Sequence, residues 1–285
     1  MSRLSGLACL WWLPEGVGAD NHQSAALPQA QSLFLTTPTM KLLAFDTSTD
    51  VMSIALTDGA RTWQHTGPGG AKASLTLIPA LLALLDEAGL RIDDLDAIAF
   101  GRGPGSFTGL RTACSVAQGL AFGARQGAGL PVLPVDTLMA LAEEARFSQA
   151  DSGGVLHITA LLDARMDELY TQDFVVDAGV CKPLAACHMV RPENLSPDAG
   201  VTLAGNVFSV YADRLPAAIA AFTRLDVLPT ATAMLRLAPT LAAAGQLVDA
   251  ALALPLYVRD KVALTTDERA VVKQQKEQAA LAAAP

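Results

Sequence analysis

Histidine and aromatic residues are scarce in this sequence, and each shortage argues against a class of site. The chain of 285 residues has four histidines, and no two of them have the spacing of a metal-binding pair on one helix. Aromatic residues make up 5% of the chain, which disfavours an extended platform on which bases could stack. Alanine and leucine carry the apolar fraction and favour helices that pack through small side chains.

Positive charge and long apolar runs are lacking as well. There are 20 Lys and Arg residues against 28 Asp and Glu residues, and the formal net charge is −8. Because affinity for nucleic acid comes largely from Lys and Arg on phosphates, a role near RNA would require a basic partner. No apolar run reaches the roughly 20 residues that a membrane span needs, so we expect a soluble protein.

The four cysteines form no Cys-x-x-Cys pair. Cys181, Cys187 and His188 lie close in sequence, but their spacing matches no zinc motif. The favoured interpretation is free thiols in a reducing cytoplasm. The sequence therefore predicts a cytoplasmic protein without a metal site.

Two terminal segments differ from the rest of the chain. Residues 1–39 have no steady hydrophobic period, and a clean strand pattern starts only after Met40. We expect an ill-ordered extension translated upstream of a start at Met40, with an export signal as the less favoured alternative. Residues 263–285 begin with a capping box at Thr265 and Glu268 and continue as a polar, alanine-rich helix. This tail is predicted to fray or project, and a docking arm is the alternative.

Residues 40–148 alternate between strand and helix patterns. Asp58 and Gly59 mark a hairpin, and Gly89 marks the end of a helix that starts at Ser74. The expected strands are 41–46, 51–58, 61–66, 97–101 and 131–135, and the expected helices are 74–88, 108–122 and 137–145. Three strands followed by alternating helices and strands predict a ribonuclease-H-like α/β domain.

Residues 149–262 start in a similar way. We expect a hairpin from 155–165 and 168–176, a strand at 201–206 and a helix at 230–244. The repeated order predicts a duplication, with a second ribonuclease-H-like domain over this range. Two such domains make up the actin-like ATPase fold, also called the ASKHA fold, and this α/β architecture is the predicted fold class.

Asp46 ends the first predicted strand and is followed by hydroxyl residues. Nucleotide-binding domains of this fold present such a carboxylate to a metal ion and such hydroxyls to phosphate. Asp46, Thr47 and Ser48 could instead hydrogen-bond the backbone of their own turn, and from this motif alone that second interpretation is favoured.

A glycine-rich stretch, FGRGPGSFTGLR, occupies residues 100–111 between a predicted strand and a predicted helix. Glycine allows positive φ and close approach of another backbone, and Ser106 or Thr108 can cap a helix whose N–H groups favour an anion. The spacing is neither Gly-x-Gly-x-x-Gly nor a Walker loop. We predict a specific role, with Gly103 and Gly105 as candidate phosphate contacts. Whether the guest is a ligand or a protein stays open.

Several stretches together resemble the TsaB family, also called YeaZ: FDTST, GRGPGSFTGLR, PVLPVDTL, LLDARMDELY and PLYVRDKVA. The similarity spans about residues 40–262. It implies the actin-like fold and a role in making threonylcarbamoyl-adenosine in tRNAs that read codons beginning with A. It also implies a catalytic paralogue, TsaD, which TsaB binds, a small ATPase, TsaE, and a homodimer when the protein is alone. Contact with tRNA would be indirect, through the complex.

The resemblance also implies which catalytic groups to look for. The catalytic paralogue carries two histidines four residues apart, and the corresponding positions here are Thr137 and Leu141, which cannot replace imidazole. In the second half, Asp163 is followed at 164–166 by Ala-Arg-Met where glycines would admit a phosphate. We therefore expect a non-catalytic subunit with no catalytic residues and no required cofactor. Weak or interfacial binding of ATP or ADP stays open.

Small residues are spread around the helix that follows the glycine-rich stretch. One face would suffice to cover the sheet, so the others suggest a second neighbour, and the resemblance implies pairing through this region. The candidate partner contacts, two of them on the next helix, are Leu110, Ala113, Val116, Ala117, Leu120, Leu138 and Met139.

Two other functions stay open beside that of a partner subunit. A stand-alone, ATP-dependent small-molecule kinase or ATPase of the same fold would turn over nucleotide by itself. A metallopeptidase would hold a metal ion, and no pair of histidines is spaced to bind one.

Overall fold

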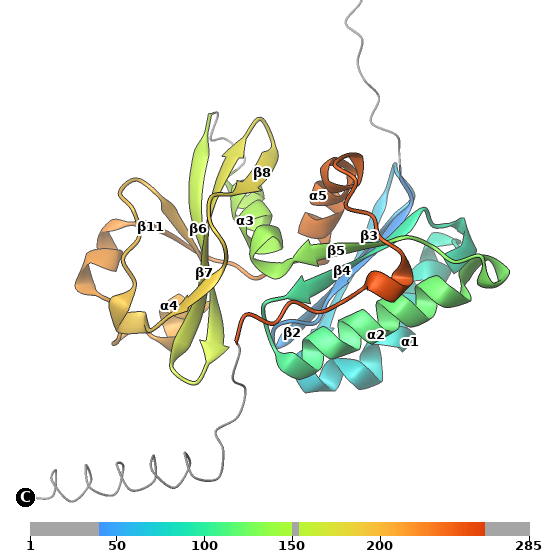
Figure 1. Ribbon diagram of the computed structural model, residues 1–285, viewed down its shortest axis with the longest axis horizontal. Helices are drawn as coiled ribbons and strands as arrows, with labels where there is room; N and C mark the ends of the chain where they lie inside the picture. Colours follow the sequence, from blue (N-terminus) through green and yellow to red (C-terminus); the bar gives the residue numbers. More distant parts are fainter. Residues whose placement is uncertain (1–39, 150–153, 260–285) are drawn as a thin grey trace, which may run out of the picture. The chain divides into compact units, whose positions relative to one another are not determined.

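The computed structural model describes residues 40–149 and 154–259 (Figure 1). Both ranges belong to one compact unit. The expectations for the extension at 1–39 and for the tail at 263–285 lie outside the described residues. Within the described ranges, no helix combines the length and the apolar character that crossing a bilayer requires.

The first sheet has five strands in the order β3-β2-β1-β4-β5. The pairs β1–β2 and β2–β3 are antiparallel, whereas β1–β4 and β4–β5 are parallel. The strands are β1 Leu42–Asp46, β2 Val51–Thr57, β3 Thr62–Pro68, β4 Ala97–Gly103 and β5 Val132–Asp136. All five strands predicted for this half are confirmed, and their order is that of a ribonuclease-H-like domain.

Helices cover both faces of the first sheet (Figure 1). They are α1 Ala73–Ala88, α2 Phe107–Gly123, α3 Thr137–Ser148 and α5 Ala231–Ala243. Because successive side chains of a strand point to opposite faces, Leu43 and Phe45 of β1 pack with α1 and α2. Leu42 and Ala44 pack with α3 and α5. The helix stop at Gly89 is confirmed, since this residue caps α1 with a φ of 68°.

The second sheet repeats the topology of the first. Its order is β11-β10-β6-β7-β8, with β9 also paired to β7. The strands are β6 Leu156–Arg165, β7 Glu168–Asp177, β8 Val180–Pro183, β9 His188–Val190, β10 Thr202–Gly205 and β11 Thr223–Asp226. The β6–β7–β8 ladder is antiparallel, and β6–β10 and β10–β11 are parallel. Two sheets of one topology confirm the predicted actin-like fold, and the domain limits near residue 148 stay a prediction.

Short helical pieces fill several connections. They are the four-residue α4 at Val207–Val210 and 3-10 turns at Gly70–Lys72, Ile92–Asp94, Ala124–Gly127, Pro192–Asn194, Ala217–Ala221 and Ala250–Leu252. None of them was predicted from the sequence, nor were the short strands β8, β9 and β11. Each piece spans only three to five residues, which is too short to show a hydrophobic period.

Helices α3 and α5 lie between the two sheets. One buried apolar cluster contains residues of α3, of α5 and of strands from both sheets, including Leu138 of α3 and Phe174 of β7. Helix α5 follows the second sheet in sequence but packs against β1 and β2. The Ala231 N–H donates to the Ser53 hydroxyl at 2.9 Å across this contact. The chain therefore leaves the second sheet and packs again on the first sheet through α5.

A buried ion cluster joins α3 to α5. Glu143, which is 2% exposed, accepts hydrogen bonds from Arg146 at 2.7 Å and from Arg236 of α5 at 2.8 Å. Arg236 also donates to Glu144 at 2.6 Å. A carboxylate buried this deeply requires such partners, because desolvation of an unpaired charge costs several kcal/mol, in order of magnitude. The cluster therefore fixes the position of α5 against α3.

Candidate functional site

The glycine-rich loop closes on the turn that follows β1. A Cβ on Gly109 would overlap the carbonyl of Thr47, and a Cβ on Gly105 would come within 2.5 Å of the Ser48 Cβ. The Thr47 hydroxyl donates to the Gly109 carbonyl at 2.7 Å, and the Ser106 N–H donates to the Ser48 carbonyl at 2.7 Å. The predicted cap is confirmed, because the Ser106 hydroxyl accepts from the Gly109 N–H. The group that packs against Gly105 and Gly109 is the turn after β1 of the same chain.

Asp46 is enclosed within that same turn. Its carboxylate accepts the N–H and the hydroxyl of Ser48 at 2.8 and 2.6 Å, and a Cβ on Gly101 would overlap it. Burial raises the pKa of Asp46, while hydrogen bonds from Ser48 and Thr137 act in the opposite direction. Asp46 and Thr47 have no exposed surface, and their assignment as nucleotide contacts stays a prediction. Asp46 hydrogen-bonds its own turn, as the favoured interpretation expected, whereas the Thr47 hydroxyl donates to Gly109 of α2.

The segment 253–259, here called the strap, packs against Gly103 and explains why this position needs glycine. A Cβ on Gly103, whose φ is 121°, would come within 2.6 Å of the Leu256 carbonyl. The Leu256 N–H donates to the carbonyl of Arg102 at 2.7 Å. Further along, Arg259 donates to the carbonyl of Ala164 in the second sheet at 3.1 Å. Gly103 is therefore occupied by the strap and not by a phosphate, and the strap joins the two sheets.

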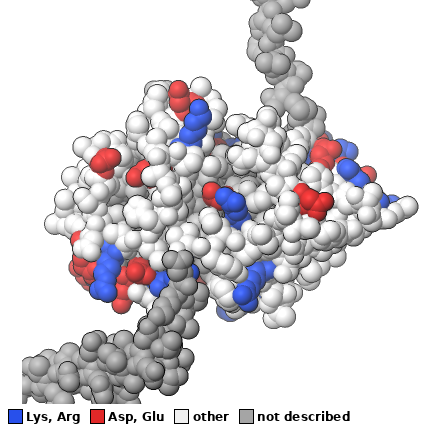
Figure 2. All heavy atoms as spheres, in the orientation of Figure 1, with Lys and Arg blue, Asp and Glu red and all other residues white. Residues whose placement is uncertain are grey.

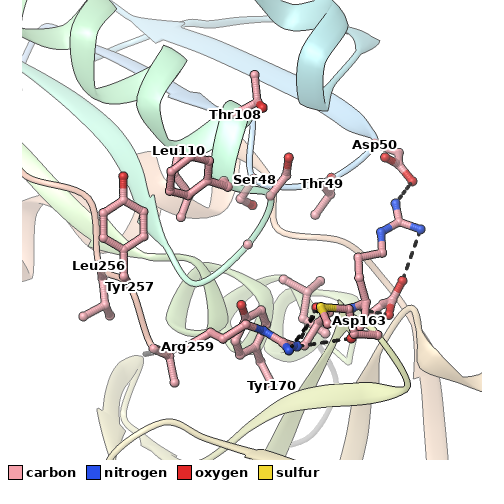
Figure 3. Close-up of a pocket in the computed structure, with 18 of the residues that line it drawn as sticks. Ser48, Thr49, Asp50, Thr108, Leu110, Asp163, Tyr170, Leu256, Tyr257 and Arg259 are labelled. Carbon is pink, nitrogen blue, oxygen red and sulfur yellow. Dashed lines mark hydrogen bonds and ion pairs between the residues drawn. The ribbon is translucent and has the colours of Figure 1, made fainter. Parts of the chain in front are cut away.

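Strap and loop border a cleft of about 290 Å³, to which both sheets contribute (Figure 3). Ser48 and Gly105 are the two predicted cofactor contacts that do line it. The remaining walls come from the turn after β1, the first turn of α2, the tip of the β6–β7 hairpin, the residue after β10 and the strap: Thr49, Asp50, Ser106, Phe107, Thr108, Leu110, Leu162, Asp163, Ala164, Arg165, Met166, Tyr170, Asn206, Leu256, Tyr257, Val258 and Arg259. Sequence reasoning missed most of this set, because its members lie on five segments far apart in the chain.

Two arginines, Arg111 and Arg259, hold the strap. The Arg111 guanidinium lies 3.9 Å from the centre of the Phe107 ring, and its Nε donates to the Tyr257 hydroxyl at 3.1 Å. Arg259 forms an ion pair with Glu168 at 2.7 Å. Both guanidinium groups are thus engaged within the chain, one on Tyr257 and the other at the last residue of the strap.

The β6–β7 turn has no glycine although its backbone is left-handed. Arg165, Met166 and Asp167 have φ of 59°, 55° and 63°. The Arg165 side chain reaches across the cleft to Asp50 at 2.5 Å and also lies 3.4 Å from Asp163. Non-glycine residues in this region are uncommon and need support from their surroundings. An arginine already paired with two carboxylates stands where a phosphate-binding enzyme of this fold would need an open turn.

The seven predicted partner contacts divide by burial. Five of them are buried in the chain's own core, namely Leu110, Ala113, Ala117, Leu138 and Met139. Their exposed fractions range from 0% to 9%, with Met139 the most exposed, so the isolated chain offers little of their surface to a partner. Their assignment as partner contacts stays a prediction. Val116 and Leu120 are half-buried and keep part of their surface free.

A different set of apolar side chains is exposed next to those two. Leu75, Ile78 and Leu82 of α1 are 81%, 45% and 49% exposed, and their spacing places them on one side of the helix. We call these three residues, together with Val116, Gly119 and Leu120 of α2, the helix face. A groove of about 490 Å³ between α1 and α2 contains Leu82, Gly119 and Leu120. The sequence of α1 could have indicated this face, because one stripe of leucines packs on the sheet and a second stripe of apolar residues does not.

The positions that correspond to the paralogue's histidines lie in the core. Thr137 and Leu141 of α3 are fully buried, and the Thr137 hydroxyl points to Asp46. Among the described residues, no group of three His, Cys, Asp or Glu side chains is placed to hold a metal ion. Burial raises the pKa of both the Cys181 and the Cys187 thiol to about 12, so both stay protonated at neutral pH.

Two sheets of identical topology with a cleft at their junction define an α/β protein of the actin-like class. A family model described as TsaD, tRNA N6-adenosine threonylcarbamoyltransferase, matches residues 70–200. The tRNA threonylcarbamoyladenosine biosynthesis protein TsaB of Haemophilus influenzae is 35% identical over 173 residues, which cover 54% of this chain and 70% of that protein. Its Escherichia coli counterpart is 36% identical over 138 residues, covering 48% and 56%.

A solved structure agrees with these relatives. YeaZ from Pseudomonas aeruginosa superposes with a TM-score of 0.68 at 38% identity, covering 76% of this chain and 99% of that one. This chain belongs to the TsaB family, also called YeaZ. The match to the TsaD model fits a common origin of the two families, as does 34% identity over 116 residues to the tRNA N6-adenosine threonylcarbamoyltransferase of Chromobacterium violaceum.

Proposed function

We propose that this chain is a non-catalytic partner subunit in the synthesis of threonylcarbamoyl-adenosine in tRNA. It binds a TsaD-type catalytic subunit through the helix face and works with the ATPase TsaE in the cytoplasm. The modified tRNAs are those that read codons beginning with A. Its relatives are named as tRNA threonylcarbamoyladenosine biosynthesis proteins. The exposed apolar helix face is the observation that supports a protein partner.

The occupant proposed for the helix face is a protein with a complementary apolar surface. Leu75, Ile78 and Leu82 keep about half or more of their surface in water. The 3-10 turn at 250–252 and the strap pack on α2, where Gln118 donates to the Ala253 carbonyl at 3.1 Å, and they leave these three side chains of α1 exposed. Contiguous apolar surface of this kind marks a protein-protein contact. In the absence of TsaD, a second copy of the chain covers the same face as a homodimer.

Contact with tRNA is proposed to be indirect. The chain carries a formal net charge of −8, and Figure 2 shows basic and acidic side chains interspersed, with no continuous basic area on the face drawn. Since binding to nucleic acid depends on Lys and Arg against phosphates, the basic surface is expected on the partner.

Lack of catalysis is supported by the chemistry of the cleft and of α3. Asp46 is sealed in its turn, Arg165 occupies the second phosphate position, and Thr137 and Leu141 replace the paralogue's histidines. No cofactor is required in this proposal, and any ATP or ADP binds weakly or between subunits. The alternative is a stand-alone kinase or ATPase, which the cleft between two actin-like sheets favours.

ATP turnover by the isolated chain separates these two functions. We expect no hydrolysis above the buffer rate in a phosphate-release assay with Mg²⁺ and a range of small-molecule acceptors. Turnover that saturates with ATP and disappears in the Thr108→Trp variant, whose side chain fills the edge of the cleft, would support the kinase and contradict the partner subunit.

A further inference from the structure

The cleft has a balance of charge that disfavours anions. Its ionisable lining consists of Asp50, Asp163, Arg165 and Arg259. Arg165 is paired with both aspartates, and Arg259 is paired with Glu168 at 2.7 Å. A phosphate entering the cleft would have to break one of these ion pairs while lying close to two carboxylates. The negative charges of the phosphate and of the two carboxylates would repel one another, even where water in the open part of the cleft screens them.

Part of the cleft lining is apolar and aromatic. Leu110 of α2, Leu162 of β6, Tyr170 of β7 and Leu256 of the strap all line it, and Figure 3 shows Leu110 and Tyr170 on opposite sides of the space. Surfaces of this kind bind the faces of planar rings, because burial of apolar area is the main gain.

Other lining residues, on the same elements, carry hydroxyl groups. Ser106 and Tyr257 use their oxygens to accept hydrogen bonds, from the Gly109 N–H and the Arg111 Nε respectively. Their hydroxyl hydrogens can therefore be donated to a ligand. Thr108 is exposed at the cleft's edge and adds a further hydroxyl. Uncharged polar groups of a ligand, such as hydroxyls or amides, would find partners here.

We propose that the cleft is a binding site for an uncharged molecule of nucleoside size, one that combines a planar ring with hydroxyl or amide groups. A volume of about 290 Å³ lies at the small end of ligand pockets, which limits the guest to this size. The site selects against phosphorylated forms of the same molecule. It does not include the helix face, so it is independent of the proposed partner.

The test uses adenosine, AMP and ATP as probes, because they share one ring system and differ in phosphate charge. Titration of the full chain, followed by ligand-observed NMR, should give saturable adenosine binding in the millimolar range or better. We expect ATP to bind at least about tenfold more weakly, which corresponds to a single unfavourable charge contact. ATP binding as tight as adenosine binding, or no saturable adenosine binding at millimolar concentration, would overturn the proposal.

Three variants test whether adenosine binds in the cleft. Thr108→Trp fills the edge from an exposed position and should abolish adenosine binding, whereas Ser115→Trp, two helical turns further along α2 and outside the cleft, should leave it unchanged. Asp50→Asn frees Arg165 from one carboxylate and should narrow the preference for adenosine over AMP by about threefold. Equal adenosine binding by both tryptophan variants would contradict this location.

Discussion

Replacing Ile78 and Leu82 together by glutamate should abolish the complex with a TsaD-type subunit. Both side chains are exposed in the isolated chain, at 45% and 49%, so the variant is expected to fold normally. In the complex, two carboxylates would be buried against an apolar partner without counter-ions. The expected loss is about 4 kcal/mol, or roughly a thousandfold in Kd, measured by calorimetry or by co-elution on size exclusion.

A matched control tests whether added charge alone explains such a loss. Val155 and Leu184 are 54% and 57% exposed and lie outside the helix face. The double glutamate variant at these two positions adds the same charge and should bind TsaD like the unmodified chain. If the Ile78 and Leu82 variant kept its affinity while both proteins stayed folded, the helix face would not be the contact.

Replacing Gly109 by alanine should strongly destabilise the fold. The new Cβ would overlap the Thr47 carbonyl, and the Thr47 hydroxyl donates to the Gly109 carbonyl at 2.7 Å. The turn after β1 would have to move away from α2, which buried surroundings resist. We expect a loss of about 3 kcal/mol in the free energy of unfolding, measured by urea denaturation.

Gly119 supplies the control on the same helix. It is exposed, and a Cβ there would meet no atom within 4 Å. Alanine at this position should raise the free energy of unfolding by about 1 kcal/mol, because alanine favours the helix more than glycine does. Equal stabilities for the Gly109→Ala variant and the unmodified chain would mean that the loop does not pack against the turn.

Much of the fold could be predicted from local patterns. Strand alternation, the Gly89 stop and the order of elements gave the first sheet and the helices around it, and they predicted the duplication. These features depend on residues close in sequence, where hydrophobic period and turn chemistry act directly. The short strands of the second half escaped prediction because their alternation is too brief to recognise.

The site was harder to predict because it depends on contacts between distant segments. Glycines that fit a phosphate equally fit another backbone, and only the packing of Gly109 on Thr47 decides between the two. The sequence did not distinguish the buried Ala117 from the exposed Leu75, because each lies on a helix with apolar residues on several sides. The resemblance pointed correctly to the family, and its assignment of individual partner contacts stays a prediction.

Formation of threonylcarbamoyl-adenosine in tRNA tests the central claim most directly. Nucleoside mass spectrometry would follow the product in mixtures of tRNA, a threonylcarbamoyl donor, TsaD and TsaE, with and without this chain. We predict product only when TsaD and this chain are both present, and none from this chain with tRNA and donor alone. Product formed by this chain without TsaD, or an equal yield when it is left out, would contradict its role as a required, non-catalytic partner.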